Sequence, residues 1–182
     1  MSLNKKSIYE HSFSRDMLLR TNKETVTSTP SINKIDISIS HSTIALNKKQ
    51  LLPVLTALEI LTGQKATFVR SKKLVPQYNI RKGALIGARV TLKGNSIYNF
   101  LEKFILLVLP KLPIDTYFAS KSISKYGNIS LTIREPLHFF ELEKEFEKFS
   151  KIPNININIH TTAMTKQEGL SLLSYLNSYL TI

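Results

Sequence analysis

The sequence predicts an α+β fold, in which a mainly antiparallel sheet has helices packed on one face and leaves its other face open. Two observations indicate this arrangement. Several short segments alternate apolar and polar residues, which is the period of strands with one buried and one solvated face. Other segments carry apolar residues at helical spacing, so the helices have one side to bury against that sheet. We expect a single domain over residues 1–182, with a helical extension at 1–27 and a projecting basic hairpin loop at 71–84.

Strands are predicted where the alternation is clearest. Ile35, Ile37 and Ile39 alternate with Asp36 and Ser38, so one face of this strand is apolar and the other is polar. The same pattern predicts further strands over 66–70, 85–93, 128–134 and 154–160. The polar face of such a sheet is available to a partner.

A first helix of the core is predicted from capping residues and an apolar stripe. Asn47 is expected to cap a helix whose Leu51, Leu55 and Leu58 share one face. Gly63 is expected to end it, because glycine adopts the left-handed conformation that closes many helices.

Two later segments are also helical by pattern. One starts at Asn95 and ends at Pro110, and a last helix opens with the capping box at 165–168. The core-facing residues of the first are expected to be Ile97, Phe100, Leu101, Phe104, Ile105 and Val108. Those of the last helix are expected to be Leu170, Leu173 and Leu176.

The composition indicates an anionic partner. The chain carries a formal net charge of +12 over 182 residues, and polyphosphate is the commonest partner of so basic a protein. A charged surface that serves only solubility is the alternative. The chain has no cysteine, which excludes disulfides, thiolate catalysis and zinc sites of the CxxC kind.

The segments that bear on location indicate an internal compartment. The longest apolar stretch, 104–109, is too short to cross a bilayer, and the N-terminus lacks the apolar core of a secretory signal, so no membrane partner is expected. Lysine outnumbers arginine by 19 to 6, which is typical of AT-rich coding sequence.

Basic residues concentrate in the middle of the chain. Between Glu59 and Glu102 there is no acidic residue. This interval holds Lys65, Arg70, Lys72, Lys73, Arg81, Lys82, Arg89 and Lys93. Nucleic-acid binding is favoured over a merely solvated hairpin, since such a surface neutralises phosphates. Tyr78 could stack on a base or ribose, but the strands lack exposed aromatic residues, so recognition by shape and backbone is expected over single-strand stacking.

Acidic residues form a run of opposite sign further along. They are Glu135, Glu141, Glu143, Glu145 and Glu147, interleaved with Lys144 and Lys148. Either this run is a solvated turn or helix edge, or it is a docking surface for a basic protein.

Catalytic and metal-binding patterns are missing from the sequence. Gly83 and Gly87 are not followed by the lysine and hydroxyl residue of a phosphate loop, and the four histidines are scattered without ligand spacing. We therefore expect no enzyme, no catalytic residues, no metal site and no cofactor.

A series of short motifs resembles one known family. They are Leu61-Thr62-Gly63-Gln64-Lys65, Ser71-Lys72-Lys73, Ile80-Arg81-Lys82-Gly83, Ile86-Gly87, Val90-Thr91-Leu92-Lys93-Gly94, Phe100-Leu101-Glu102, Leu109-Pro110, Tyr126-Gly127-Asn128, Arg134-Glu135 and Thr161-Thr162-Ala163. In this order and spacing, over roughly 28–176, they resemble the ribosomal protein L-five family, the universal proteins of the large subunit that bind 5S rRNA.

The resemblance implies a function and its residues. Such a protein is a structural constituent of the central protuberance, where its open sheet face lies on 5S rRNA and large-subunit rRNA beside neighbouring proteins. The residues implied to face rRNA are Lys34, Ser38, Gln64, Lys65, Arg89, Thr91 and Lys93. Those implied to approach P-site tRNA are Lys72, Lys73, Tyr78 and Arg81. Those implied to touch a basic small-subunit protein across the subunit interface are Glu141, Glu143, Glu145 and Glu147.

One segment departs from the family pattern, and another is similar to a subset of the family. After the first strand, where the family commonly has an asparagine and glycines, this chain has serines and a histidine at 38–42. The N-terminal segment 9–19 is similar to mitochondrial members, which favours the matrix and a mitochondrial ribosome over a plastid or the bacterial cytoplasm. A freestanding organellar RNA-binding or processing factor is the alternative function.

Overall fold

The computed structural model describes residues 15, 18–19, 29–112 and 123–180. The expected helical extension at 1–27 therefore lies outside the described residues, apart from residues 15, 18 and 19. The chain divides into two compact units. One consists of residues 36–91 and 132–157, and we call it the loop unit; the other consists of 1–35, 92–131 and 158–182, and we call it the terminal unit.

The fold is α+β, as the sequence predicts, with one antiparallel sheet of five strands in the order β2-β3-β1-β5-β4. The strands are β1 (Ile32–Ser40), β2 (Thr67–Arg70), β3 (Leu85–Leu92), β4 (Ile129–Ile133) and β5 (Ile155–Thr161). Each expected strand is present, and the first is longer than expected. The alternation that predicts β1 is confirmed, because Ile35, Ile37 and Ile39 are fully buried.

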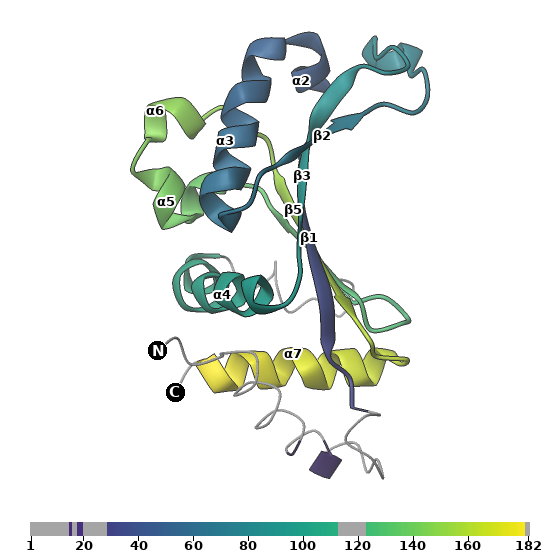
Figure 1. Cartoon of the computed structure of the whole chain (residues 1–182), viewed down its shortest axis with the longest axis vertical. Helices are drawn as coiled ribbons and strands as arrows, with labels where there is room; N and C mark the ends of the chain where they lie inside the picture. The colour runs from purple at the N-terminus through teal and green to yellow at the C-terminus, as the bar shows by residue number, and fades with distance from the viewer. Residues whose placement is uncertain (1–14, 16–17, 20–28, 113–122, 181–182) are drawn as a thin grey trace. The chain divides into compact units, whose positions relative to one another are not determined.

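In the loop unit, helices cover one face of the strands (Figure 1). They are α2 (Ser42–Leu46), α3 (Leu51–Thr62), α5 (Phe140–Glu143) and α6 (Phe146–Phe149), with short turns η2 (Lys48–Gln50), η3 (Pro76–Tyr78) and η8 (Pro136–His138). Both α5 and α6 contact α3. Buried side chains from helices and strands, among them Val54, Leu58 and Leu142, form the core of this unit, and each contributes about 1.5–3 kcal/mol by its burial.

The residues at the two ends of helix α3 explain where it begins and ends. Gly63 ends it in the left-handed conformation with φ of 65° and a hydrogen bond to the carbonyl of Glu59, as expected. Asn47, however, caps the preceding turn η2 and not α3, because its Oδ1 accepts from the backbone N–H of Lys49. Pro53 falls in the first turn of α3, where a missing N–H costs little.

The apolar stripe expected on α3 is only partly in the core. Leu58 is fully buried, whereas Leu51 and Leu55 are half-buried. Val54 and Leu61 complete the buried side of the helix.

In the terminal unit, α4 (Asn95–Lys103) continues into a π-helical turn, η4 (Phe104–Val108), and a short turn, η5 (Leu109–Lys111). Every residue expected on the core stripe of this segment is buried. The regular helix is shorter than expected and stops at Lys103. Pro110 contributes to the change, because it has no N–H to donate to the carbonyl of Leu106 and its ring would clash with that carbonyl in a regular α-helix.

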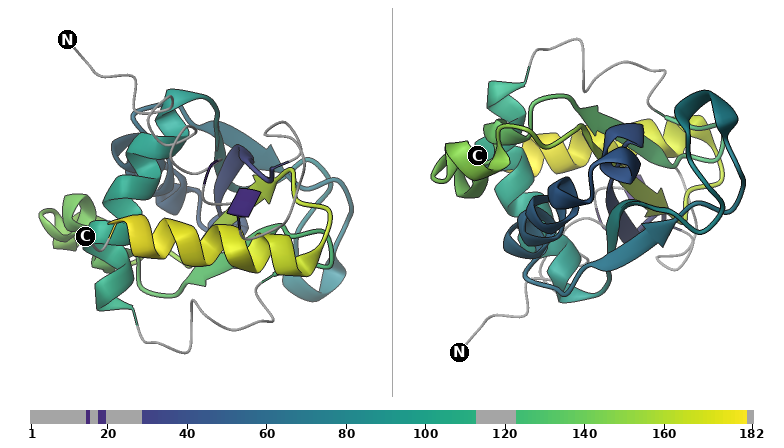
Figure 2. Two further views of the ribbon diagram at one scale, coloured as in Figure 1. Left: turned by 90° about the horizontal axis from the view of Figure 1, so that it is seen from below. Right: turned by 90° about the horizontal axis from the view of Figure 1, so that it is seen from above.

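Helix α7 (Lys166–Leu180) opens with the expected cap. Thr165 Oγ1 accepts from the N–H of Glu168, while the Glu168 carboxylate accepts from the N–H of Met164. In Figure 2, left, α7 is seen along its full length.

The inward side of α7 differs from the expected one. Leu170 was expected in the core, which is wrong, since that residue is 42% exposed and Leu172 is buried instead. Leu173 is half-buried, and the side chain of Leu176 lies outside the described residues. Gly169 packs against the backbone of Gly127 and thereby fixes which side of α7 faces inward.

Candidate nucleic-acid interface

The hairpin of β2 and β3 carries the basic cluster. Its strands pair in antiparallel register, with Thr67 opposite Arg89 and Phe68 opposite Ala88. Their connection, 71–84, which we call the basic loop, is closed at its base because the N–H of Ser71 donates to the carbonyl of Ala84. The loop leaves the strands at one end of the hairpin (Figure 1).

The basic loop is itself folded. Val75 and Ile80 exchange two backbone hydrogen bonds, of 2.9 and 3.2 Å, and enclose the turn η3. The side chain of Ile80 is buried, which anchors this second pairing. The loop is therefore a small hairpin within the larger one and not an irregular connection.

The loop residues predicted to contact tRNA all present exposed side chains. Lys72, Lys73 and Arg81 are exposed, and Tyr78 is 53% exposed. A cation that stays in water can release counterions from a phosphate backbone when it binds, without first breaking an internal ion pair. Figure 2, right, shows the loop on the far side of α3 from α5 and α6, as Figure 1 does.

Three of the residues predicted to contact rRNA, Ser38, Arg89 and Thr91, lie on strands of the loop unit at positions that alternate with buried residues, and Gln64 and Lys65 lie in the connection between α3 and β2. Arg89 on β3 and Lys65 before β2 are exposed, while Ser38, Gln64 and Thr91 are not. The hydroxyl of Thr91 donates to Oδ1 of Asp36, which ties β3 to β1 on this face. The surface is therefore basic and hydroxyl-rich, with one carboxylate among the cations.

Lys34 and Lys93 belong to the terminal unit. Lys93 is exposed and Lys34 is half-buried. Lys93 directly follows β3, and Lys34 lies within β1. The half-buried Lys34 precedes the buried Ile35 in the alternation of β1, and Lys93, just beyond the end of β3, stays a predicted rRNA contact.

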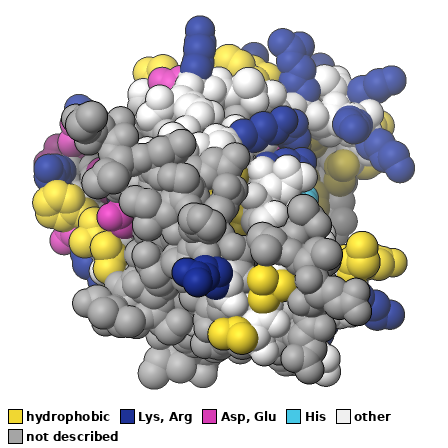
Figure 3. All heavy atoms as spheres, turned by 60° about the horizontal axis from the view of Figure 1, so that its bottom comes forward, with side chains coloured by type: hydrophobic (Ala, Val, Ile, Leu, Met, Phe, Trp, Pro, Cys, Tyr) yellow, Lys and Arg dark blue, Asp and Glu magenta, His cyan; other side chains and the backbone are white. Residues whose placement is uncertain are grey.

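The acidic run forms the helical pair α5 and α6 and the residues around it. Glu143, Glu145 and Glu147 are exposed and Glu141 is half-buried. Glu145 pairs with Lys148 at 2.8 Å, and this pair raises the pKa of Lys148, first through the hydrogen bond and then through the carboxylate charge. In Figure 3, Lys and Arg side chains stand out at the upper right, whereas the acidic side chains at the left lie among basic and hydrophobic ones.

Two aromatic side chains accompany the acids, which the sequence analysis did not identify. Phe140 is 51% and Phe146 is 59% exposed. The ammonium of Lys144 lies 4.5 Å from the centre of the Phe140 ring, so this ring already accepts a cation on its face. The exposure of these two rings could have been predicted from the helical period of α5 and α6, since Leu142 and Phe149 are buried while Phe140 and Phe146 are exposed.

The described residues contain no group of three His, Asp or Glu side chains that could hold a metal ion. Among the helices of residues 29–112 and 123–180, none has the length and apolar character needed to cross a membrane.

Asp36 is an acidic residue of the interface that was not predicted from the sequence. Its place on the polar face could have been predicted from the alternation of β1, because Asp36 occupies a polar position between Ile35 and Ile37.

Comparison with known proteins agrees with the motifs. The sequence profile for the C-terminus of the ribosomal L-five protein family matches residues 85–178. The chain is 42% identical over 169 residues to the large ribosomal subunit protein uL5m of Reclinomonas americana, with 93% of each chain covered. It is 36% identical over 169 residues to uL5 of Buchnera aphidicola, with 93% of each covered. It is 35% identical over 171 residues to uL5 of Prochlorococcus marinus, with 94% of this chain and 95% of that one covered.

These relatives span nearly the whole chain, and the profile covers the segment from β3 to α7. The chain belongs to the uL5 family of large ribosomal subunit proteins, which are structural constituents of the ribosome and not enzymes.

Proposed function

We propose that the chain binds 5S rRNA and large-subunit rRNA in the central protuberance, as a single ribosomal domain, and contacts P-site tRNA through its basic loop during translation. The single observation that carries this proposal is the acid-free hairpin, whose cations are exposed on β3 and on the loop. Phosphate contacts of this kind supply most of the affinity for RNA and position the protein on it.

The rRNA contact is assigned to the open face. Arg89 and Lys65 supply charge for phosphates, while Ser38, Gln64 and Thr91 supply hydroxyl and amide groups for phosphate or ribose oxygens. Lys34, within β1, and Lys93, directly after β3, are two further cations assigned to rRNA in the terminal unit.

The expectation that the strands lack exposed aromatic residues is wrong for β2, since Phe68 is 51% exposed. Phe68 lies opposite the buried Ala88 and therefore not on the face of Arg89. Among the described strand residues on the Arg89 face of the loop unit there is no phenylalanine, tyrosine or tryptophan, and such a face suits the backbone of a double-stranded RNA better than stacked bases.

The tRNA contact is assigned to the basic loop. Lys72, Lys73 and Arg81 are exposed around a folded turn, and Tyr78 presents a ring that can stack on a ribose or base. The shape of the loop is set before binding, because the Val75–Ile80 pairing does not depend on a partner.

A basic small-subunit protein is assigned to α5 and α6. The carboxylates of Glu141, Glu143, Glu145 and Glu147 provide charge of the opposite sign to the rest of the protein. Phe140 and Phe146 provide exposed rings among these carboxylates, and aromatic residues are common anchors of protein interfaces. Partners rich in lysine and arginine would find both ion pairs and cation–π contacts there.

The mitochondrial matrix is the proposed location, since the chain shares 42% identity with a mitochondrial relative and its composition is lysine-rich. The alternative, a freestanding organellar RNA-processing factor, would use the same hairpin but would leave the ribosome at modest salt.

Cosedimentation tests the proposal. In a sucrose gradient at moderate salt, the chain is expected in the large-subunit fractions, and its presence only in free-protein fractions would favour the processing factor. A gel of RNA extracted from the purified particle then shows whether 5S rRNA is present. A particle that retains the chain but lacks 5S rRNA would leave only the large-subunit rRNA contact.

A further inference from the structure

A pocket of about 290 Å³ opens in the loop unit between the start of α3 and the segment that joins α6 to β5. It is lined by Asn47, Lys49, Gln50, Pro53, Lys148, Lys151 and Ile152. None of these residues belongs to the basic loop or to the open face assigned to rRNA. Small-molecule pockets begin at about 300 Å³, so this one fits a single small group and not a large cofactor.

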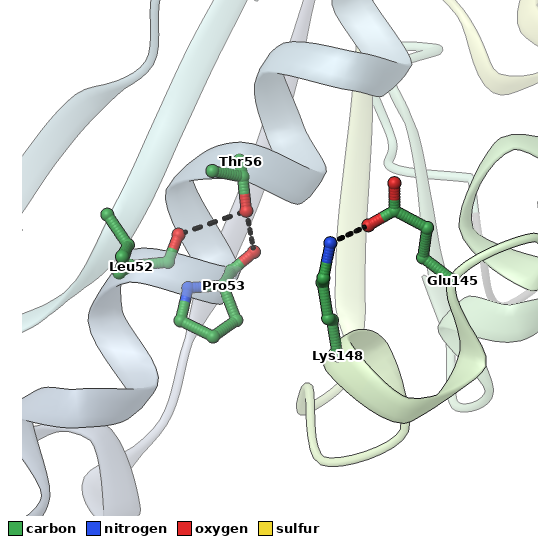
Figure 4. Close-up of polar contacts among 5 residues, drawn as sticks. All are labelled: Leu52, Pro53, Thr56, Glu145 and Lys148. Carbon is green, nitrogen blue, oxygen red and sulfur yellow. Dashed lines mark hydrogen bonds and ion pairs between the residues drawn. The ribbon is translucent and has the colours of Figure 1, made fainter.

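The lining of the pocket is cationic. Lys49, Lys148 and Lys151 converge on it from segments about a hundred residues apart in the sequence, and no carboxylate lines it. Glu145 lies just outside and holds the ammonium of Lys148 at 2.8 Å (Figure 4). Because this ion pair is exposed, it contributes little and exchanges readily for another anion.

The polar groups of the pocket are suited to an anion with a neighbouring hydroxyl. Asn47 Oδ1 is occupied by the N–H of Lys49, which leaves the amide N–H groups of Asn47 as donors. Thr56 is not available, since its hydroxyl donates to the carbonyls of Leu52 and Pro53 (Figure 4).

Gln50 supplies a second observation. Its Oε1 is closed off from solvent and has no hydrogen-bond partner among the described residues. A buried acceptor without a partner is costly and marks a place that a water or ligand completes. The terminal amide of glutamine turns easily about its last torsion angle, and a rotation of this amide would present its oxygen to a ligand in the pocket.

We propose that this pocket binds one nucleotide unit of an RNA strand, with its phosphate held by Lys49, Lys148 and Lys151 and its ribose hydroxyl near Gln50. A phosphate accounts for the three ammonium groups, and the 2′-hydroxyl is the donor that the Gln50 oxygen lacks. The site is a second RNA contact of the ribosomal protein, and it therefore rests on the proposed function.

The first test measures the salt dependence of binding of the full chain to large-subunit rRNA. The double variant Lys49→Gln/Lys151→Gln is expected to bind several-fold more weakly and to reduce the salt slope by about 1. The matched control, Lys125→Gln/Lys166→Gln, removes the same charge from exposed lysines elsewhere and is expected to stay within about twofold of wild type. Equal losses in both variants, or none in either, would overturn the site; no RNA binding by wild type would instead overturn the proposed function.

Two further arms separate the sources of an anion. Inorganic phosphate, titrated against the 15N-labelled chain, is expected to shift the Lys49 and Lys151 signals only at millimolar concentration. Submicromolar binding of phosphate with unchanged RNA affinity in the double variant would identify a free-phosphate site. Because the chain has no cysteine, Lys151→Cys provides a single thiol for a short photoreactive group in assembled subunits. Crosslinks to RNA are expected, and crosslinks only to a protein would contradict the proposal.

Discussion

The Thr91 hydroxyl donates a hydrogen bond to the Asp36 carboxylate across β3 and β1, on the face that we assign to rRNA. A carboxylate there repels phosphates at neutral pH, yet it also orients the Thr91 hydroxyl. The interface thus contains a charge that weakens affinity and a hydrogen bond that orders the surface. These two effects can be separated, because an asparagine keeps the acceptor oxygen and removes the charge.

Asp36→Asn is expected to raise the affinity for large-subunit rRNA by roughly threefold to tenfold at low salt, with a smaller gain at high salt. Filter binding over a series of salt concentrations measures this. Glu135→Gln is the control, since it removes one negative charge from a side chain that is 76% exposed and lies outside the strands. If both substitutions raised the affinity equally, only the net charge of the chain would matter.

The triple substitution Lys72→Ala, Lys73→Ala and Arg81→Ala is expected to weaken tRNA occupancy of the P site by about tenfold or more, with nearly normal incorporation into subunits. Ribosomes purified from the variant report both quantities, by tRNA filter binding and by protein content. A control triple of alanines at Lys111, Lys125 and Lys166 carries the same charge change in the terminal unit. Loss of assembly with normal tRNA binding in surviving particles would contradict the assignment of the loop.

Gly87→Ala is expected to destabilise the protein by at least about 3 kcal/mol. A Cβ at this position would lie 2.0 Å from the carbonyl oxygen of Ile39, so β1 and β3 could not keep their pairing. Gly63→Ala is the matched comparison, because it has open space and only its φ of 65° is unfavourable, at about 1–2 kcal/mol. Urea unfolding measures both, and similar losses would show that the close approach at Gly87 is not rigid.

Glu145→Gln is expected to lower the pKa of Lys148 toward its ordinary value. In the native protein that pKa is raised above 10.5 by the hydrogen bond and charge of Glu145. A raised lysine pKa means that the pair favours the folded state below the unfolded pKa, and that this contribution is lost as the pH rises through the folded pKa. The 15Nζ signal of Lys148, followed through its titration at alkaline pH, measures the shift; an unchanged midpoint in the variant would refute the pairing in solution.

The sequence predicted the strands well because their alternation has a period of two and one buried face, as Ile35 to Ile39 illustrate. It predicted less well where tertiary contacts decide. The inward side of α7 depends on the contact of Gly169 with Gly127, which places Leu172 and not Leu170 in the core. A local stripe of leucines cannot reveal such a contact.

The candidate site also has a part that was predictable from the sequence and a part that was not. The basic loop was predictable, since its cations are close together in a segment without acids. The pocket lined by Lys49, Lys148 and Lys151 was not predictable from the sequence. Lys49 and Lys148 are far apart in the sequence and come together only when α3 packs beside α6. The exposure of the Phe140 and Phe146 rings was only partly predictable from the sequence. It follows from the helix boundaries, which are difficult to predict for helices of four residues.

The inner pairing of Val75 with Ile80 has a thermodynamic consequence for how the loop meets its partner. A segment that folds only on binding buries much new surface and shows a large negative heat-capacity change. A loop that is already a hairpin buries only its contact area, so we expect a small heat-capacity change for the proposed contact with tRNA. A contact of this kind would form and dissociate without refolding of the loop.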